Sequence, residues 1–225
     1  MQIIAIIPAR GGSKGIPMKN LTMLGGKPLL DYTITASLDS KINRTIVSTD
    51  NEEIFKTAKQ LGAEVIKRPQ ILATDESQIE PVIVHVLEQL KQENYVPDIV
   101  LLLQNTSPLR SSKHIDSALD FFMSNDYDSV FSGFPSHNML WEVNDTCVKP
   151  LNYNPLKRQN RQDMHNQFIE NGAIYITKNN QFDTTNCRVS GKIGVFQMSE
   201  EDSIEIDSLN DLFIAEQILK MRNKK

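Results

Sequence analysis

Short apolar segments alternate with amphipathic ones along most of this chain, and this alternation is what most limits the folds available to it. Strands are predicted at 3–7, 45–48, 64–67, 99–103 and 129–133, and helices at 29–37, 51–61, 79–92 and 114–124. Residues 99–103 are continuously aliphatic, which is typical of a central parallel strand buried on both faces. The pattern predicts a single α/β domain over residues 1–225, built on a doubly wound, mainly parallel sheet.

Local signals place the ends of one predicted helix. Asp50 stands immediately before residues 51–61, where we expect it to act as the N-cap. Glu52 and Glu53 suit the positive end of the helix dipole, and Gly62 is expected to end the helix.

Composition narrows the classes of function. The chain has 225 residues and a net charge of −4, which argues against a general nucleic-acid binder. No apolar run approaches the roughly 20 residues needed to span a bilayer, so no membrane association is expected. The N-terminal segment does not resemble a signal peptide, and Cys147 and Cys187 do not make a disulfide framework. We therefore expect a cytoplasmic protein.

A glycine-rich basic loop follows the first predicted strand directly. It contains Arg10, Gly11, Gly12, Ser13, Lys14, Gly15, Lys19 and Asn20. Glycines allow a close approach of the backbone to a ligand, and the basic side chains supply positive charge. A loop of this kind at the carboxyl end of a strand predicts a phosphate-binding site, whereas the alternative is an ordinary solvated turn that happens to be basic.

The loop matches neither of the two common phosphate signatures. Its spacing is wrong for a Walker A loop, and Pro17 interrupts the helix that a dinucleotide fingerprint requires. We therefore expect an extended loop that wraps a triphosphate rather than a loop that caps a helix.

A set of segments in order along the chain resembles the acylneuraminate (CMP-sialic acid) cytidylyltransferases. The matching segments are IPARGGSKG with Lys19–Asn20, STD at 48–50, Arg68-Pro69, LQNTSPLR at 103–110, ENGAIY at 170–175 and IEID at 204–207. The resemblance implies a Rossmann-like nucleotidyltransferase fold that uses CTP to activate a nonulosonic acid, with release of pyrophosphate. It covers essentially the whole chain.

The resemblance implies which residues bind CTP. Arg10, Gly11, Gly12, Ser13, Lys14, Lys19 and Asn20 are expected around the triphosphate, with Arg10 and Lys19 serving catalysis. Gln104 follows a buried strand and is expected to read the pyrimidine edge, because an amide both donates and accepts. Arg68 is expected near the nucleotide; the alternative is a structural ion pair.

A second pair of polar residues predicts a metal site. Glu205 and Asp207 stand two apart, so on a strand their side chains would point the same way. Two carboxylates with phosphate oxygens suffice for Mg²⁺ (or Mn²⁺). The family motif has aspartate at both positions, so Asp207 is the firmer ligand, and Glu205 binds directly or through water. The alternative is a solvated acidic edge.

The sugar site is expected to use Gln104, Asn171 and an arginine, Arg161 or Arg158, for the sugar carboxylate. Two departures from the family, Trp141 and the pair Arg188–Val189, leave the sugar open between sialic acid and legionaminic, pseudaminic or deaminated neuraminic acid.

The strand–helix alternation breaks at residues 136–167. Long irregular inserts are usually functional or form interfaces, and the resemblance implies a dimerisation arm that covers the partner's active site in a homodimer. The alternative is a surface excursion. For the whole chain, two other functions stay open, a CMP-Kdo synthetase-like enzyme and a non-catalytic CTP-binding homologue.

Overall fold

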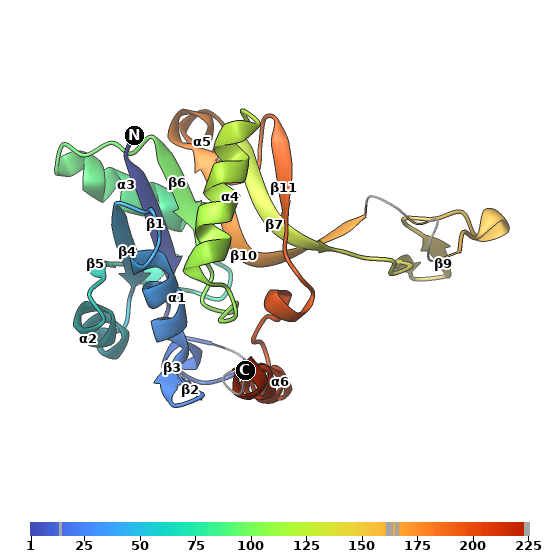
Figure 1. Ribbon diagram of the computed structural model, residues 1–225, viewed down its shortest axis with the longest axis horizontal. Helices are drawn as coiled ribbons and strands as arrows, with labels where there is room; N and C mark the ends of the chain where they lie inside the picture. Colours follow the sequence, from blue (N-terminus) through green and yellow to red (C-terminus); the bar gives the residue numbers. More distant parts are fainter. Residues whose placement is uncertain (14, 161–163, 165–166, 223–225) are drawn as a thin grey trace.

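A seven-stranded sheet forms the centre of the protein, with strand order β11-β7-β10-β6-β1-β4-β5 (Figure 1). The computed structural model describes residues 1–13, 15–160, 164 and 167–222. The strands are β1 (Ile3–Pro8), β4 (Arg44–Thr49), β5 (Glu64–Lys67), β6 (Ile99–Leu102), β7 (Ser129–Pro135), β10 (Phe168–Lys178) and β11 (Ile193–Gln197). Each of the five predicted strands is present, within two residues of its predicted bounds.

One strand of the sheet runs against the others. β10 lies between β6 and β7 and pairs antiparallel with both, whereas the remaining strand pairs are parallel. Its pairing with β7 shifts register between Glu170 and Tyr175, and Gly172 there has a φ of +65°. The mainly parallel sheet is confirmed, and β10 is the reversed strand that sequence periodicity did not predict.

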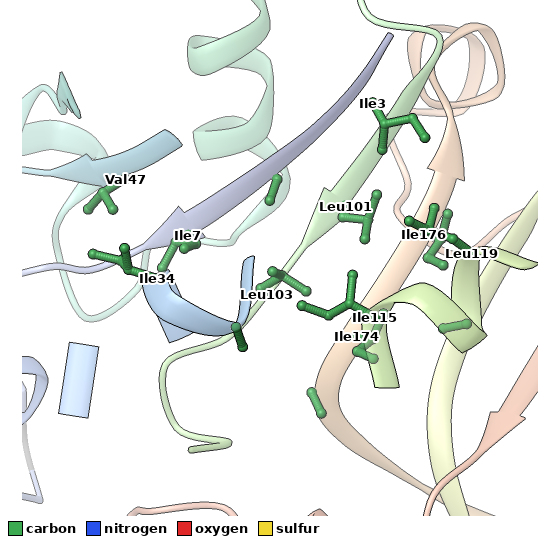
Figure 2. Close-up of a cluster of buried hydrophobic side chains, with 14 of the residues drawn as sticks. Ile3, Ile7, Ile34, Val47, Leu101, Leu103, Ile115, Leu119, Ile174 and Ile176 are labelled. Carbon is green, nitrogen blue, oxygen red and sulfur yellow. The ribbon is translucent and has the colours of Figure 1, made fainter. Parts of the chain in front are cut away.

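Helices cover both faces of the sheet, as the doubly wound prediction requires. Packed against one face are α1 (Leu29–Leu38), α2 (Glu52–Gln60) and α4 (Ser112–Ser124), and against the other are α3 (Glu80–Gln92) and α5 (Asn179–Thr185). β1 supplies both cores, because Ile7 joins the first core and Ile6 the second. Figure 2 shows the first core, in which Ile7, Leu101 and Ile174 come from three strands.

A third, smaller core lies beneath the glycine-rich loop. The C-terminal helix α6 (Leu209–Arg222) and the short hairpin of β2 (Met23–Leu24) and β3 (Lys27–Pro28) pack there. Ile16, from the loop, and Ile206, from the acidic segment, are both buried in this core. The two segments are 190 residues apart, and their shared apolar contact brings them together.

The N-cap of α2 differs from the prediction. Asn51 caps the helix, because its Oδ1 accepts hydrogen bonds from the N–H groups of Glu53 (2.9 Å) and Ile54 (3.1 Å). Asp50 instead accepts a hydrogen bond from the Gly11 N–H at 2.9 Å. The prediction was wrong by one residue, since both side chains are good cap formers and only the tertiary fold gives Asp50 a different donor.

Residues 136–160 form an arm that projects from one end of the sheet (Figure 1). The arm carries a two-stranded hairpin of β8 (Trp141–Asn144) and β9 (Cys147–Pro150), followed by the 3-10 turn η3 (Pro155–Lys157). The Trp141 and Tyr153 rings meet edge to face, with centroids 5.6 Å apart. The insert is therefore ordered by a hairpin, whereas its sequence predicted no regular element.

None of the helices in the described ranges has the length and apolar character that crossing a membrane requires.

The cap assignment predicts that Asn51→Ala lowers the free energy of unfolding by about 1 kcal/mol, because two N–H groups of α2 lose their acceptor. Urea denaturation measures the loss. Asn51→Ser, which retains a capping oxygen, is the control and should stay close to wild type. Equal stability of the alanine and serine variants would contradict the assignment.

Candidate active site

A cleft of about 400 Å³ opens at the carboxyl ends of β1 and β6. Its lining comes from four separate segments: Pro8, Arg10, Gly12, Ser13, Lys19 and Asn20; Arg68, Leu72, Thr74, Asp75, Ser77, Gln78, Ile79 and Val82; Gln104, Asn105 and Thr106; Glu205 and Asp207. Ligands bind at this edge in open α/β sheets. Most of the predicted nucleotide and metal residues therefore converge in one place.

The described part of the glycine-rich loop is irregular. A single 3-10 turn, η1 (Lys19–Leu21), follows it, which agrees with the prediction that no α-helix begins there. A Cβ on Gly15 would overlap the carbonyl oxygen of Asp207, whereas one on Gly12 would meet no atom within 4 Å. The loop thus packs its last glycine on the acidic segment and leaves Gly12 open to the cleft. Lys14 lies outside the described residues.

The two arginines that line the cleft differ in burial and in the groups that they contact. The Arg10 guanidinium forms an ion pair with Asp75 at 2.7 Å. Arg68 is buried, donating from Nη2 to the Ser48 carbonyl oxygen at 2.7 Å and from Nε to the Ser48 hydroxyl at 3.2 Å. Burial lowers the pKa of Arg68 to about 10, and the nearby charge of Arg10 acts in the same direction. In the described residues the hydrogen bonds of Arg68 go to Ser48 and not to a carboxylate, so the alternative of a structural ion pair has no support there.

Lys19 joins the loop to the acidic segment. Its Nζ donates to Asp207 Oδ1 and to the Ile206 carbonyl oxygen, both at 2.9 Å. The lysine side chain is only 15% exposed, while that of Asp207 is 73% exposed. The ammonium group is thus held at the cleft wall, and the carboxylate remains open to a ligand.

Asparagines connect the loop to the segment that carries Gln104. Asn20 donates from Nδ2 to the Arg10 carbonyl oxygen at 2.9 Å, and Asn105 donates to Asn20 Oδ1 at 3.0 Å. Asn105 is 3% exposed. The amide of Asn105 therefore links the two loops, a role that the sequence analysis did not predict.

The acidic pair lies in a segment that is not part of any sheet, which corrects the strand that the sequence suggested. Ile206 donates its N–H to the Thr106 carbonyl oxygen at 2.7 Å, and its side chain is fully buried. Glu205 and Asp207, on either side, both line the cleft. The pKa of Glu205 is raised, first by burial and then by the charge of Asp207, so a cation placed between them would be stabilised.

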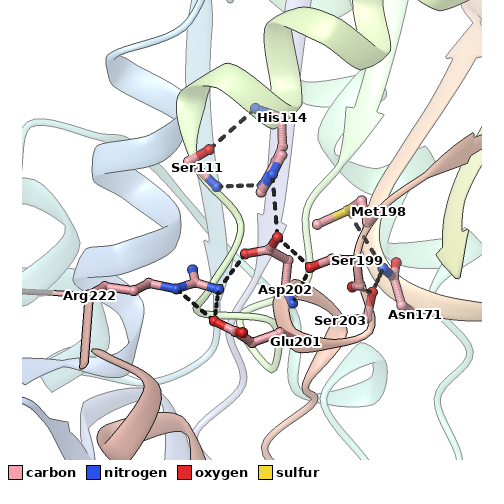
Figure 3. A network of polar contacts seen from close by, with 9 residues as sticks. All are labelled: Ser111, His114, Asn171, Met198, Ser199, Glu201, Asp202, Ser203 and Arg222. Carbon is pink, nitrogen blue, oxygen red and sulfur yellow. Dashed lines mark hydrogen bonds and ion pairs between the residues drawn. The ribbon is translucent and has the colours of Figure 1, made fainter. Parts of the chain in front are cut away.

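A network of polar contacts holds the turn before this pair, η5 (Glu201–Ser203) (Figure 3). Arg222 at the end of α6 binds Glu201 at 2.7 Å and Asp202 at 2.8 Å. On the other side of Asp202 lies His114 Nε2, at 3.8 Å. Burial lowers the pKa of His114, which favours its neutral form near pH 7.

The structure assigns Asn171 a structural role instead of sugar binding. Its side chain is 1% exposed, donates to Ser203 Oγ at 2.7 Å and accepts from Ser132 Oγ at 2.6 Å. The site residue here is its neighbour Gly172. A Cβ on Gly172 would overlap both Gln104 Oε1 and Glu205 Oε1, so the glycine permits these two side chains to meet.

Of the two arginines predicted for the sugar carboxylate, Arg158 is not among the residues that line this cleft. Arg158 lies on the arm, beside His137, Asn138 and Met164. The arm that carries Arg158 projects away from the sheet (Figure 1). Arg161 lies outside the described residues.

Arg188 belongs to a row of polar side chains in contact with one another, called here the polar row: Glu80, Arg188, Tyr175 and Glu170. It forms an ion pair with Glu80, at the start of α3, and its guanidinium lies 4.9 Å from the centroid of the Tyr175 ring. The Tyr175 hydroxyl donates to Glu170, and burial together with this carboxylate raises its pKa. Arg188, one of the departures from the family, is thus held by a carboxylate and an aromatic ring of this chain.

Comparison with known proteins adds to this geometry. The sequence pattern of the family described as cytidylyltransferase matches residues 4–222, nearly the whole chain. The chain belongs to the cytidylyltransferase family.

Curated relatives within this cytidylyltransferase family include N-acylneuraminate cytidylyltransferase A of Danio rerio, 37% identical over 96% of this chain. The N-acylneuraminate cytidylyltransferase of Streptococcus agalactiae serotype V is 32% identical over 94% of this chain. The match covers 50% of the first protein and 52% of the second. The chain spans about half the length of these relatives.

Solved structures agree with the fold of this cytidylyltransferase. A CMP-2-keto-3-deoxy-manno-octonic acid synthetase in complex with CTP gives a TM-score of 0.74 at 16% identity, covering 99% of this chain and 100% of the other. The 4-diphosphocytidyl-2C-methyl-D-erythritol synthase of Anaerococcus prevotii gives 0.67 at 16% identity, with 97% and 98% covered. At these identities the likeness establishes a Rossmann-like nucleotidyltransferase fold.

Gly172→Ala tests the contact at the cleft floor. We expect a loss of activity of at least tenfold, because the added Cβ displaces the side chains of Gln104 and Glu205. The positive φ of residue 172 adds about 1–2 kcal/mol of backbone strain, which lowers the free energy of unfolding. The control is Gly26→Ala, at φ +90° with no atom within 4 Å of its Cβ. Gly26→Ala should lose stability but keep activity, as measured by urea denaturation and turnover. An equal activity loss in both variants would contradict the assignment.

Proposed function

We propose that this protein transfers CMP from CTP to the anomeric hydroxyl of an acylneuraminate-type nonulosonic acid and releases pyrophosphate. The observation that carries the proposal is the convergence of the basic loop, Gln104 and the Glu205–Asp207 pair in one cleft. The family and its N-acylneuraminate relatives support the same reaction.

The chain's own residues supply charge and alignment. In the proposal, Arg10, Lys14 and Lys19 hold the triphosphate with Gly11, Gly12 and Ser13, while Arg68 and Asn20 complete this wall. The sugar hydroxyl loses its proton to solvent as its oxygen bonds to the α-phosphorus, while the bond from that phosphorus to the leaving pyrophosphate breaks and negative charge grows on the pyrophosphate. Fixed cations that face this charge lower the barrier without reorganising. Gln104 orients the cytosine ring and the sugar.

Glu205 and Asp207 fit a divalent metal ion such as Mg²⁺ or Mn²⁺. They are two carboxylates that line one cleft, and the pKa of Glu205 is raised first by burial and then by the charge of Asp207, both of which a bound cation would offset. When bound, the metal would neutralise phosphate charge. Asp207 is the more exposed of the two and is the firmer ligand in the proposal.

In this proposal, recognition of the sugar depends on the formation of a homodimer. The arm is the element that would bring Arg158, and with it Arg161, over the cleft of a second copy. Its exposed apolar side chains support an interface; they are Leu140, Trp141, Val143, Val148, Leu151 and Leu156. The polar row at Arg188 favours a nonulosonic acid with polar groups on that side over one held by an apolar pocket.

Pyrophosphate release from CTP and Mg²⁺ tests the reaction with a panel of acids: N-acetylneuraminic, deaminated neuraminic, legionaminic, pseudaminic and Kdo. We expect release with one of the nine-carbon acids. Release with Kdo alone would support the CMP-Kdo synthetase-like alternative. CTP binding without release from any acid would support the non-catalytic homologue.

Variants of the cleft check the assigned roles. Asp207→Ala should abolish turnover with the fold intact, whereas Glu200→Ala, an exposed carboxylate nearby, should leave it unchanged. Lys19→Ala should weaken nucleotide use by about 1–3 kcal/mol, the scale of a lost charged hydrogen bond. Lys27→Ala is its exposed control. Near-normal activity of Asp207→Ala would contradict the assignment of Asp207 as a metal ligand.

We expect a charged substitution on the arm to change the oligomeric state of the protein. Val143, on β8, is 76% exposed, and a charge there should disrupt an apolar interface. We expect wild type to elute as a dimer in light-scattering chromatography and Val143→Asp as a monomer with reduced turnover. Val96→Asp, 61% exposed and away from the arm, is the control. A monomeric wild-type protein with full activity would contradict the arm's role.

A further inference from the structure

Arg110 is a buried cation whose position neither the sugar nor the nucleotide site explains directly. The residue is 2% exposed, and among the described residues its Nε and Nη2 have no hydrogen-bond partner. Burial lowers its pKa to about 9. In the described part of the chain no ion pair joins Arg110 to a carboxylate. Its charge contributes to the lowered pKa of His114. A buried, half-satisfied charge calls for a specific reason.

The one nitrogen of Arg110 that is satisfied makes two hydrogen bonds to different segments. Nη1 donates to the Gln104 carbonyl oxygen at 3.1 Å and to the Ala173 carbonyl oxygen at 2.9 Å. The first segment carries Gln104 into the cleft, and the second belongs to β10 directly after Gly172. Arg110 therefore bridges the two backbones whose side chains and glycine meet at the cleft floor.

A second contact joins the same segments. Ser107 Oγ donates to the Asn171 carbonyl oxygen at 3.2 Å. Between these two cross-links stands Gly172, against which the ends of Gln104 and Glu205 both lie. A small shift of residues 104–110 relative to β10 would therefore move the Gln104 amide, because its backbone carbonyl is one of the anchored atoms.

We propose that Arg110 is a positioning residue that fixes the Gln104 amide for selection of the nucleotide base. The inference rests on the proposed function, in which Gln104 reads the pyrimidine edge. A buried arginine serves this role because one nitrogen with two N–H groups reaches two carbonyl oxygens at once. An apolar side chain of similar length fills the same space and bridges nothing.

Binding of CTP and UTP to the full chain, each alone and measured calorimetrically, gives a selectivity ratio that tests the proposal. We expect Arg110→Met to reduce the CTP-over-UTP ratio by about tenfold, the discrimination that one buried hydrogen bond provides. Arg110→Lys keeps a donor that can serve both carbonyl oxygens and should stay within about threefold of wild type.

A control separates this effect from lost stability. Phe122→Leu, at the far end of α4 in the first core, should lower stability and leave the ratio unchanged. Should Arg110→Met not fold, Arg110→Gln is the second variant, because its shorter amide cannot bridge both oxygens; we expect it to lose the ratio as well.

The outcomes distinguish the two proposals. A wild-type protein that binds CTP and UTP equally overturns the role of Gln104 in the proposed function. A selective wild type whose ratio survives in Arg110→Met, or in Arg110→Gln, overturns the positioning role alone. A ratio that falls equally in Phe122→Leu also overturns it, since general loosening would then suffice.

Discussion

The hydrogen bond from the Ile206 N–H to the Thr106 carbonyl oxygen, 2.7 Å long, is the contact on which the site depends. It fastens the C-terminal acidic segment to the loop after β6, at the carboxyl edge of the sheet. Lys19 fixes the same segment from the opposite side through the Ile206 carbonyl oxygen. With both peptide groups of Ile206 held and its side chain buried, the neighbouring carboxylates have a defined direction into the cleft.

Much of the surrounding structure keeps this arrangement rigid. The third core joins Ile16 of the loop to Ile206, and the η5 network ties Asp202 to Arg222 (Figure 3). Buried polar groups of this kind are costly unless satisfied, and Asn171 meets that condition with partners on three segments. The site is thus preorganised by backbone and buried side chains, while Asp207 and Gly12 stay open to a ligand.

Sequence patterns predicted the parallel strands β1, β4, β5, β6 and β7 and the helices α1 to α4, because each depends on local periodicity, but they missed the parallel strand β11. They failed where the outcome depended on a distant partner. Asp50 and Asn51 are equivalent as cap formers, and the Gly11 N–H decides between them. Asn171 was predicted to bind sugar from its motif, but its amide points into the protein. β10 was not predicted, and its reversed direction is set by its pairing with β6 and β7, which no local pattern encodes.

The sequence alone determined the α/β class, the glycine-rich basic loop after the first strand and the family to which the chain belongs. Local composition and ordered motifs are sufficient for these. The tertiary structure decided which residues share the cleft, how Gly172 lets Gln104 meet Glu205, and that Arg110 bridges their backbones. These contacts join residues that lie far apart along the chain, and their geometry exists only once the sheet has formed and its loops have packed at one edge.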